Sequence, residues 1–293
     1  MKNWILAVRP KTLFASLAPV ILGLAVAYVE TQTMNVLIAV LTALCALFLQ
    51  IASNLANDYL DALRGVDNNK RLGPIRVTST GLIPLSTMKN ALALVLFIAF
   101  LLGVYLMYVG GPFIITIGLF SLYFAYGYTG GPFPLSYNGL GEVAAFLFFG
   151  VVAVVGTNFL QTHTFSKLAL ILGMGPGFIS ACILAVNNLR DIESDRETNK
   201  HTLAVRFGEG FQRKLCITMI ALSMAVCLYV MIAYHYKLLG PVLILPFLFH
   251  KTWLQILYHP IDSKLNTALA RTAQYNLLYC LFISVGIVLS FRL

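Results

Sequence analysis

Two short segments of the chain concentrate the side chains that can bind a metal ion. Their candidate ligands are Asn57, Asp58, Asp61 and Asp67 in residues 54–76, and Asn187, Asp191 and Asp195 in residues 187–206. Residues three and four apart share one face of a helix, so each segment predicts a polar stripe on a helix. Clustered carboxylates and Asn oxygens are hard ligands of the kind that Mg²⁺ prefers. The sequence therefore predicts two Mg²⁺-binding motifs.

Basic residues follow each acidic cluster. Arg71 and Arg76 follow the first cluster, and Lys200 follows the second. Arg and Lys side chains bind phosphate oxygens, and Mg²⁺ commonly shares its ligands with the phosphates of a substrate. Acid and base together in both segments predict a metal–diphosphate site, in which these three residues contact the diphosphate.

The rest of the chain is strongly apolar. Of its 293 residues, 59% are hydrophobic and only 11% are charged, whereas charged residues make up about a quarter of a soluble domain. A membrane helix needs about 20 apolar residues. Apolar runs of suitable length lie near residues 13–30, 35–56, 88–108, 112–128, 140–159, 167–187, 213–234, 238–257 and 273–291. We therefore expect an all-α polytopic membrane protein with nine transmembrane helices.

The basic residues predict how these helices are oriented. Cytoplasmic loops of membrane proteins carry an excess of Lys and Arg. With the N-terminus in the cytoplasm, 17 of the 20 basic residues fall on that side, and only Lys167, Lys237 and Arg292 fall on the other. Both motifs follow an even-numbered apolar run, so both are predicted on the cytoplasmic side. This distribution explains the net charge of +9 without a nucleic-acid partner.

The two motifs resemble those of a known family. The strings NLANDYLDALRGVD and RLGPIR in the first segment, and NNLRDIESDRETNKHTLAVRFG in the second, are similar to the paired Asp-rich motifs of the UbiA superfamily of intramembrane aromatic prenyltransferases. Within it they look most like the branch that prenylates 1,4-dihydroxy-2-naphthoate in menaquinone biosynthesis. Residues 9–12 and 137–142 also fit that branch. One departure is Asn199, where the family pattern has Gly; Asn also tolerates a left-handed backbone.

The resemblance implies a fold and a reaction. It implies a single domain over residues 1–293, a helical bundle with a central cavity, in the bacterial cytoplasmic membrane. In the family, Mg²⁺ held by both motifs grips a polyprenyl diphosphate and promotes loss of diphosphate, and the prenyl chain is transferred to the aromatic ring. With 1,4-dihydroxy-2-naphthoate as acceptor, CO₂ is also lost and demethylmenaquinone forms. Asp61 and Asp191 are then the central catalytic residues.

Other residues are predicted to act on the aromatic ring. Tyr128 and Tyr137 flank the loop 130–136, and we expect them to order the ring or the prenyl cation. Arg9 or Lys11 is a candidate to bind the naphthoate carboxylate, although membrane topology explains basic residues at this place equally well. Some aromatic side chains are candidates to line the cavity, namely Phe120, Tyr123, Tyr126, Phe146, Phe148 and Phe149.

Two alternatives remain open from the sequence. A related prenyltransferase acting on 4-hydroxybenzoate or homogentisate would share the same metal chemistry and differ only in its acceptor pocket. A secondary transporter built from inverted repeats would place its acids near the midplane of the membrane. Here both motifs run in the same chain direction and lie at helix ends, which disfavours a transporter.

Overall fold

The chain folds as a helical bundle in the computed structural model, which describes residues 2–65 and 72–292. All regular elements of these residues are helices, which confirms the predicted all-α class. They are α1 (Lys2–Val8), α2 (Pro10–Thr31), α3 (Val36–Leu63), α4 (Leu85–Gly127), η1 (Leu135–Tyr137), α5 (Gly141–Phe146), η2 (Leu147–Val152), α6 (Ala153–Thr162), α7 (Lys167–Arg190), α8 (Ile192–Glu197), α9 (Leu203–Phe207), α10 (Glu209–Ala233), η3 (Lys237–Ile244), α11 (Leu245–Leu248), α12 (His250–Tyr258) and α13 (Leu265–Arg292).

Length and apolarity make this bundle an integral membrane protein. Within the described residues, seven helical segments are long and apolar enough to cross a membrane. The number becomes eight if Lys237–Leu248 and His250–Tyr258, which meet at an angle of 43°, form one broken span. The predicted number of nine is higher than this range.

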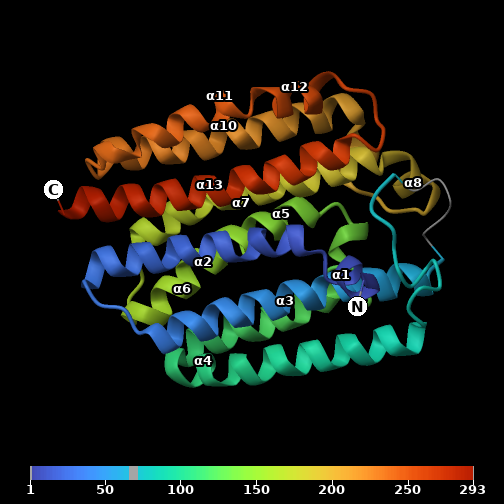
Figure 1. Ribbon diagram of the computed structural model, residues 1–293, viewed down its shortest axis with the longest axis horizontal. Helices are drawn as coiled ribbons and strands as arrows, with labels where there is room; N and C mark the ends of the chain where they lie inside the picture. The colour runs from blue at the N-terminus through green and yellow to red at the C-terminus, as the bar shows by residue number, and fades with distance from the viewer. Residues whose placement is uncertain (1, 66–71, 293) are drawn as a thin grey trace.

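The difference from nine lies in α4. This helix has 43 residues and would measure about 65 Å if straight, roughly twice the hydrocarbon thickness of a bilayer. It is not straight, because Gly111 has φ 63° and ψ −156° and Pro112 follows it. Figure 1 shows the chain turning back within α4. The predicted runs 88–108 and 112–128 lie on either side of Gly111. Nine spans result only if both halves of α4 and the bent pair are counted, so this number stays a prediction.

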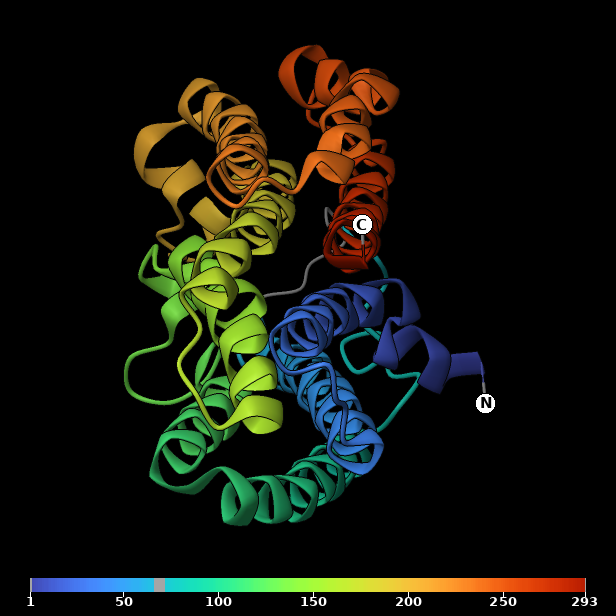
Figure 2. The same ribbon diagram turned by 90° about the vertical axis from the view of Figure 1, so that its left-hand side faces the viewer.

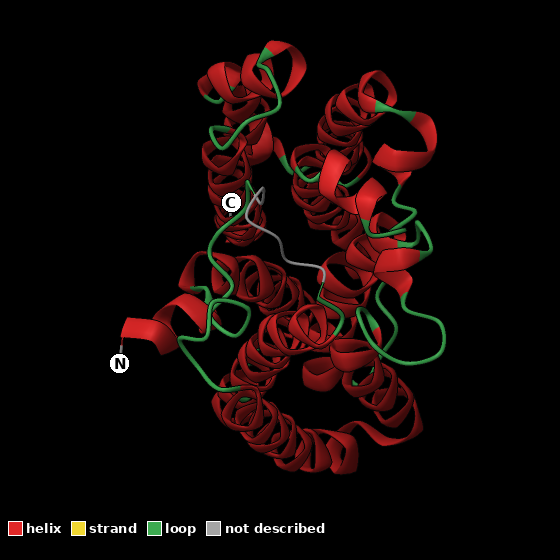
Figure 3. Cartoon of the chain, turned by 90° about the vertical axis from the view of Figure 1, so that its right-hand side faces the viewer, coloured by secondary structure: helices red, strands yellow, loops and turns green. Residues whose placement is uncertain are grey.

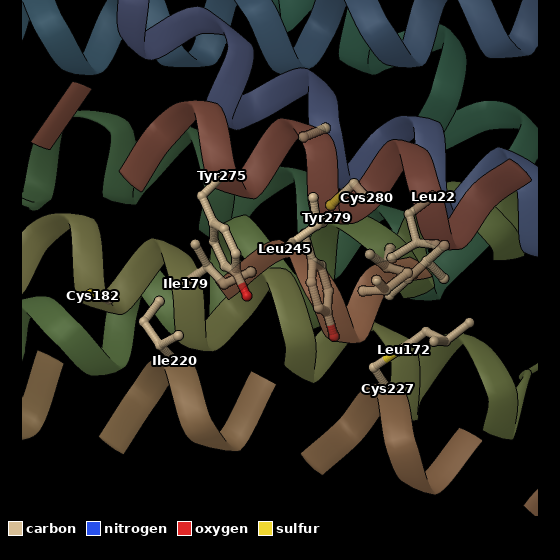
Figure 4. Close-up of a cluster of buried hydrophobic side chains, with 14 of the residues drawn as sticks. Leu22, Leu172, Ile179, Cys182, Ile220, Cys227, Leu245, Tyr275, Tyr279 and Cys280 are labelled. Carbon is tan, nitrogen blue, oxygen red and sulfur yellow. The ribbon is translucent and has the colours of Figure 1, made fainter. Parts of the chain in front are cut away.

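The core of the bundle lies between α2, α7, α10 and α13. Leu22, Leu172, Ile179 and Cys227 are fully buried there together with Tyr275 and Tyr279 (Figure 4). The Tyr279 hydroxyl donates a hydrogen bond to the backbone oxygen of Ser223 at 2.7 Å, so its polar end is satisfied inside the apolar core.

Glycines let η2 and α7 approach closely beside this core. A Cβ atom on Gly150 would lie 2.3 Å from the Cα atom of Gly177, so neither position has room for a side chain. Small residues at such contacts are typical of helices packed in membranes. The close contact fixes α7, and with it the start of the second motif, against the α5–α6 segment.

The long helices lie side by side, so the bundle has two distinct ends. Seen end-on, α4 lies at one edge of the bundle and α10 and α12 at the opposite edge (Figure 2). The N-terminus, α1 and α8 lie at one end and the C-terminus at the other (Figure 1). Figure 3 shows the first of these ends, where long loops connect the helices. Because α3 and α7 both finish here, the two acidic motifs lie at the same end of the molecule.

Candidate active site

Both motif segments line one cavity of about 830 Å³. At its polar end lie the predicted ligands Asn57, Asp61, Asn187, Asp191 and Asp195. The cavity then continues along mostly apolar side chains of α3, α4 and the α5–α6 segment, among them Leu49, Leu106, Ile117 and Phe148. The predicted central cavity is therefore present, with a charged end and an apolar interior.

On α3, the side chains of Asn57 and Asp61 face the cavity one helical turn apart. An Asp61 carboxylate oxygen lies 2.6 Å from Nη2 of Arg76, and both side chains are buried. The Asn57 side-chain oxygen accepts a hydrogen bond from the Thr129 hydroxyl. Arg76, predicted to bind diphosphate, thus lies directly beside a predicted metal ligand.

Asp58 has a different role from its neighbours. Its carboxylate accepts hydrogen bonds from the backbone N–H groups of Val77 and Thr78, at 3.2 and 3.0 Å, and the residue is only 1% exposed. It is not among the residues that line the cavity. Asp58 therefore anchors the loop that carries Arg76, which argues against its predicted role as a metal ligand.

In the second motif, Arg190 holds the side chains of Asn187 and Asp191. Nε and Nη2 of Arg190 donate to the two Asp191 carboxylate oxygens at 2.8 and 2.5 Å. Nη2 also donates to the Asn187 side-chain oxygen at 2.8 Å. Sequence reasoning used Arg190 only as a positive charge for topology and missed this contact, because nothing in the sequence distinguishes it from the neighbouring Arg196.

Asp195 is the third cavity carboxylate, and its partner is Lys200. Lys200 Nζ lies 3.4 Å from one carboxylate oxygen, while the other oxygen is buried without a hydrogen-bond partner among the described residues. Burial, partly offset by Lys200, raises the pKa of Asp195 to about 6. Burial would lower the pKa of Lys200, but Asp195, Asp61 and Asp191 together outweigh it and raise that pKa.

These electrostatic effects join the two motifs. Asp61, from the first motif, raises the pKa of both Asp195 and Lys200 from the second. Asp61 and Asp195 also line the same cavity. The two acidic clusters therefore form one site rather than two.

The two predicted tyrosines lie at different places. Tyr128 lines the cavity, and burial followed by the charges of Glu142, Asp195 and Asp61 raises the pKa of its hydroxyl, which therefore stays protonated. Tyr137 is not among the cavity-lining residues. Its ring instead faces two cations, with Cζ of Arg64 4.6 Å and Nζ of Lys200 5.9 Å from the ring centre.

The loop around Tyr137 fastens the second motif. The Tyr137 backbone oxygen accepts a hydrogen bond from His201 N at 3.0 Å, and Arg206 donates to the Asn138 backbone oxygen at 3.1 Å. Asn199, where the family pattern has Gly, has φ 55°, so this Asn does adopt the left-handed backbone.

A buried polar cluster lies behind the second motif. Glu142 on α5 accepts hydrogen bonds from Asn188 at 3.0 Å and from Gln212 at 2.9 Å. These three residues come from α5, α7 and α10, so the cluster fixes the helix that carries Asn187. Sequence reasoning noted Glu142 only as part of the 137–142 segment and did not predict this contact.

The remaining predicted residues fall in three groups. Asp67 and Arg71 lie outside the described residues, as does the side chain of Lys11. Arg9 lines the cavity. Of the predicted aromatic residues, Phe148 and Phe149 line the cavity, and the lining does not include Phe120, Tyr123, Tyr126 and Phe146.

Comparison with known proteins identifies the family. Residues 16–285 match the model of the UbiA prenyltransferase family. The chain belongs to the UbiA prenyltransferase family. It is therefore an enzyme that transfers prenyl groups, as the motifs predicted.

Two curated relatives carry the same name, 1,4-dihydroxy-2-naphthoate octaprenyltransferase. The Escherichia coli protein is 39% identical over 217 residues, which cover 72% of this chain and 70% of the relative. The Bacillus subtilis protein is 31% identical over 291 residues, which cover 97% of this chain and 91% of the relative. These matches extend across most of the chain, well beyond the two motifs.

The fold agrees with solved structures of the family. A UbiA homologue from Archaeoglobus fulgidus, solved with GPP and Mg²⁺, superposes with a TM-score of 0.72, covering 98% of this chain and 99% of that one. Its sequence is 16% identical, so the likeness establishes the shared fold.

The polar end of the cavity fits a divalent cation by its chemistry. Its ligands are carboxylate and amide oxygens, and one Asp195 oxygen is buried without a hydrogen-bond partner in the described ranges. Asp61, Asp191 and Asp195 form ion pairs with Arg76, Arg190 and Lys200, respectively. Within residues 2–65 and 72–292, three acidic, His or Cys side chains are nowhere close enough to hold one ion by themselves. Asn oxygens or substrate phosphates must therefore complete any metal shell.

Proposed function

We propose that this UbiA-family enzyme transfers a polyprenyl chain from polyprenyl diphosphate to 1,4-dihydroxy-2-naphthoate, releasing diphosphate and CO₂ and giving demethylmenaquinol, the reduced form of demethylmenaquinone. The observation that carries the proposal is the single cavity, which joins both acidic motifs at one end to an apolar interior. The names of the Escherichia coli and Bacillus subtilis relatives support the choice of acceptor.

The polar end of the cavity is suited to bind the diphosphate through Mg²⁺. We propose Asn57, Asp61, Asn187, Asp191 and Asp195 as the residues that hold the metal. Bound Mg²⁺ would neutralise the charge that develops on the leaving diphosphate. Arg76 and Lys200, which lie within 3.4 Å of Asp61 and Asp195 respectively, would contact the remaining phosphate oxygens. Arg71 stays in the proposal on its charge and sequence position alone.

The apolar interior is suited to the isoprenoid tail. The cavity lining includes both Thr42 and Asp61 on α3, and 19 residues of helix correspond to about 28 Å. A tail that runs along this path from the diphosphate is enclosed by apolar side chains. The same side chains exclude water from the allylic cation that forms when the C–O bond to diphosphate breaks.

We propose that Tyr128 and Arg9, which both line the cavity, hold the aromatic ring. Tyr128 keeps its proton and can therefore donate a hydrogen bond to an acceptor oxygen. Arg9 can pair with the naphthoate carboxylate. In the proposed reaction the ring carbon that bears this carboxylate forms the new C–C bond to the prenyl C1. The electrons of the bond to CO₂ then return to the ring as CO₂ leaves.

The cellular setting is part of the proposal. The bias of Lys and Arg supports an N-terminus and active site on the cytoplasmic side, and the bacterial relatives support the cytoplasmic membrane. The N-terminus and both motifs share one end of the bundle (Figure 1), which agrees with this orientation. We also propose that residues 1–293 form a single domain.

A membrane assay tests the proposed reaction. Membranes containing the protein are supplied with 1,4-dihydroxy-2-naphthoate, a polyprenyl diphosphate and Mg²⁺, and demethylmenaquinone is measured by mass spectrometry. Product should form with the wild-type chain and not with an inserted Asp191→Asn control. Product from 4-hydroxybenzoate but none from dihydroxynaphthoate would overturn the proposed acceptor while leaving prenyl transfer in place.

A further inference from the structure

Arg190 donates hydrogen bonds to several side chains at the polar end of the cavity. Besides its bonds to Asp191 and Asn187, its Nη1 donates to the Asn266 side-chain oxygen at 2.6 Å. The residue is only 2% exposed. All three of its side-chain nitrogens are therefore occupied, and the guanidinium is fixed in one orientation.

Asn266 extends this contact to the first motif. It lies near the start of α13, and its Nδ2 donates to the backbone oxygen of Leu72 at 2.8 Å. Leu72 belongs to the loop that carries Arg76 onto Asp61. A continuous path of hydrogen bonds thus runs from Asp191 through Arg190 and Asn266 to the loop of the first motif.

We propose that Arg190 and Asn266 are positioning residues that hold the two motifs in register for metal binding. The inference rests on the proposed Mg²⁺–diphosphate site and adds two residues that act on its ligands from outside. Arg190 orients the ligands of the second motif, and Asn266 fixes the loop of the first motif relative to them.

The hydrogen bonds from Arg190 do not by themselves prevent these ligand oxygens from binding a cation. Each carboxylate oxygen and each amide oxygen has two lone pairs. Arg190 donates one hydrogen bond to each Asp191 oxygen and one to the Asn187 oxygen, so its own contacts use only one of the two lone pairs on each of these oxygens. A fixed outer partner of this kind orients metal ligands and raises metal affinity.

A competing interpretation makes the opposite prediction. If Arg190 were only a substitute for the cation, it would compete with the metal for Asp191. Removal of the guanidinium would then tighten metal binding. The metal affinity of the Arg190 variants therefore distinguishes a positioning role of Arg190 from competition with the metal. This measurement does not depend on turnover.

The test is Mn²⁺ binding to the purified full-length protein in detergent, followed by electron paramagnetic resonance. The variants are Arg190→Gln, Arg190→Lys and Asn266→Leu. The matched control is Arg213→Gln, because Arg213 is also a buried arginine and donates to the backbone oxygens of Ile256 and His259 on another part of the bundle. Arg213 is not among the residues that line the cavity.

We expect Arg190→Gln to weaken Mn²⁺ binding about 10- to 100-fold, the range typical of residues that hold a metal ligand from outside. Asn266→Leu and Arg190→Lys should weaken it in the same direction by a smaller factor. Arg213→Gln should lower the thermal unfolding midpoint and leave the Mn²⁺ affinity of the folded fraction unchanged. If Arg190→Gln does not fold, Arg190→Lys and Asn266→Leu decide the matter.

Unchanged or tighter Mn²⁺ binding in the Arg190 and Asn266 variants would overturn the proposal, as would an equal loss in Arg213→Gln. The outcome is separable from the proposed reaction. An inactive wild-type chain that binds Mn²⁺ more tightly than its Arg190 variants would refute the acceptor and keep the positioning role.

Discussion

Asp58 offers a sharp test, because it lies between two proposed metal ligands in sequence but accepts hydrogen bonds from backbone N–H groups. Its carboxylate accepts from Val77 N and Thr78 N. A hydrogen bond to a charged group contributes about 1.5–3 kcal/mol. Asp58→Asn keeps one acceptor oxygen but turns its amide NH₂ group towards the second backbone N–H, so one hydrogen bond is lost and the variant should be about 2–3 kcal/mol less stable. Asp58→Ala should lose both bonds, about 3–6 kcal/mol.

The assay combines unfolding with a Mg²⁺ titration. Stability is measured by reversible unfolding in mixed detergent micelles, and turnover of the folded fraction is measured against Mg²⁺ concentration. Asp58→Asn should be less stable than wild type. Its Mg²⁺ concentration for half-maximal turnover should stay within about twofold of the wild-type value, a change that corresponds to less than about 0.5 kcal/mol of binding free energy. The control Asp61→Asn, on the same helix, should abolish turnover while the protein stays inserted.

Two results would refute this reasoning about Asp58. One is wild-type stability in Asp58→Asn, which would mean that the two backbone contacts contribute nothing measurable. The other is a Mg²⁺ requirement raised tenfold or more in a stable variant. That outcome would return Asp58 to the set of metal ligands, where its sequence position first placed it.

Three further predictions concern the charged and apolar ends of the cavity. The Mg²⁺ concentration for half-maximal turnover should rise as the pH falls through about 6. The reason is that Asp195, whose pKa is raised to about 6, must lose its proton to bind a cation. A Mg²⁺ concentration for half-maximal turnover that is constant between about pH 5 and 8 would contradict this prediction. Lys200→Gln should raise KM for the prenyl diphosphate by about tenfold or more and leave KM for the aromatic acceptor nearly unchanged. The reverse pattern in steady-state kinetics would contradict the proposed contact between Lys200 and the diphosphate. Gly156 lines the cavity, and a Cβ atom added there would lie 3.6 Å from Ile117 Cδ1, an ordinary van der Waals contact. The variant Gly156→Leu should therefore fold. Its larger side chain should reduce kcat/KM more for a long prenyl diphosphate than for geranyl diphosphate. The control Gly240→Ala, where a Cβ meets nothing within 4 Å, should affect both substrates equally little; an equal loss for both in Gly156→Leu would place the tail elsewhere.

Helical periodicity was enough to predict much of the site. The spacing of four residues placed Asn57 with Asp61, and Asn187 with Asp191, and each pair does face the cavity. The same periodicity placed Asp58 on this stripe. It could not reveal that Asp58 turns to the N–H groups of Val77 and Thr78, which lie 19 and 20 residues further on.

Contacts between distant residues account for what the sequence left out. Arg190 was visible only as a charge, because its partner Asn266 lies 76 residues away and carries no motif. The number of spans depends on a local feature, because the backbone of Gly111 leaves the helical conformation between two apolar runs of α4. Apolar composition predicts that a helix enters the membrane, but a single backbone angle decides where it turns back.

The central claim is that carboxylates from two distant helix ends share divalent cations and one diphosphate. Its most direct test is a structure of the full chain with Mn²⁺ and a non-reactive prenyl thiodiphosphate, with the metal located by anomalous scattering. The account predicts metal density between Asp61 on one side and Asp191 and Asp195 on the other, with the diphosphate bound there and the tail in the apolar interior. Metal and diphosphate bound away from these three carboxylates would contradict it.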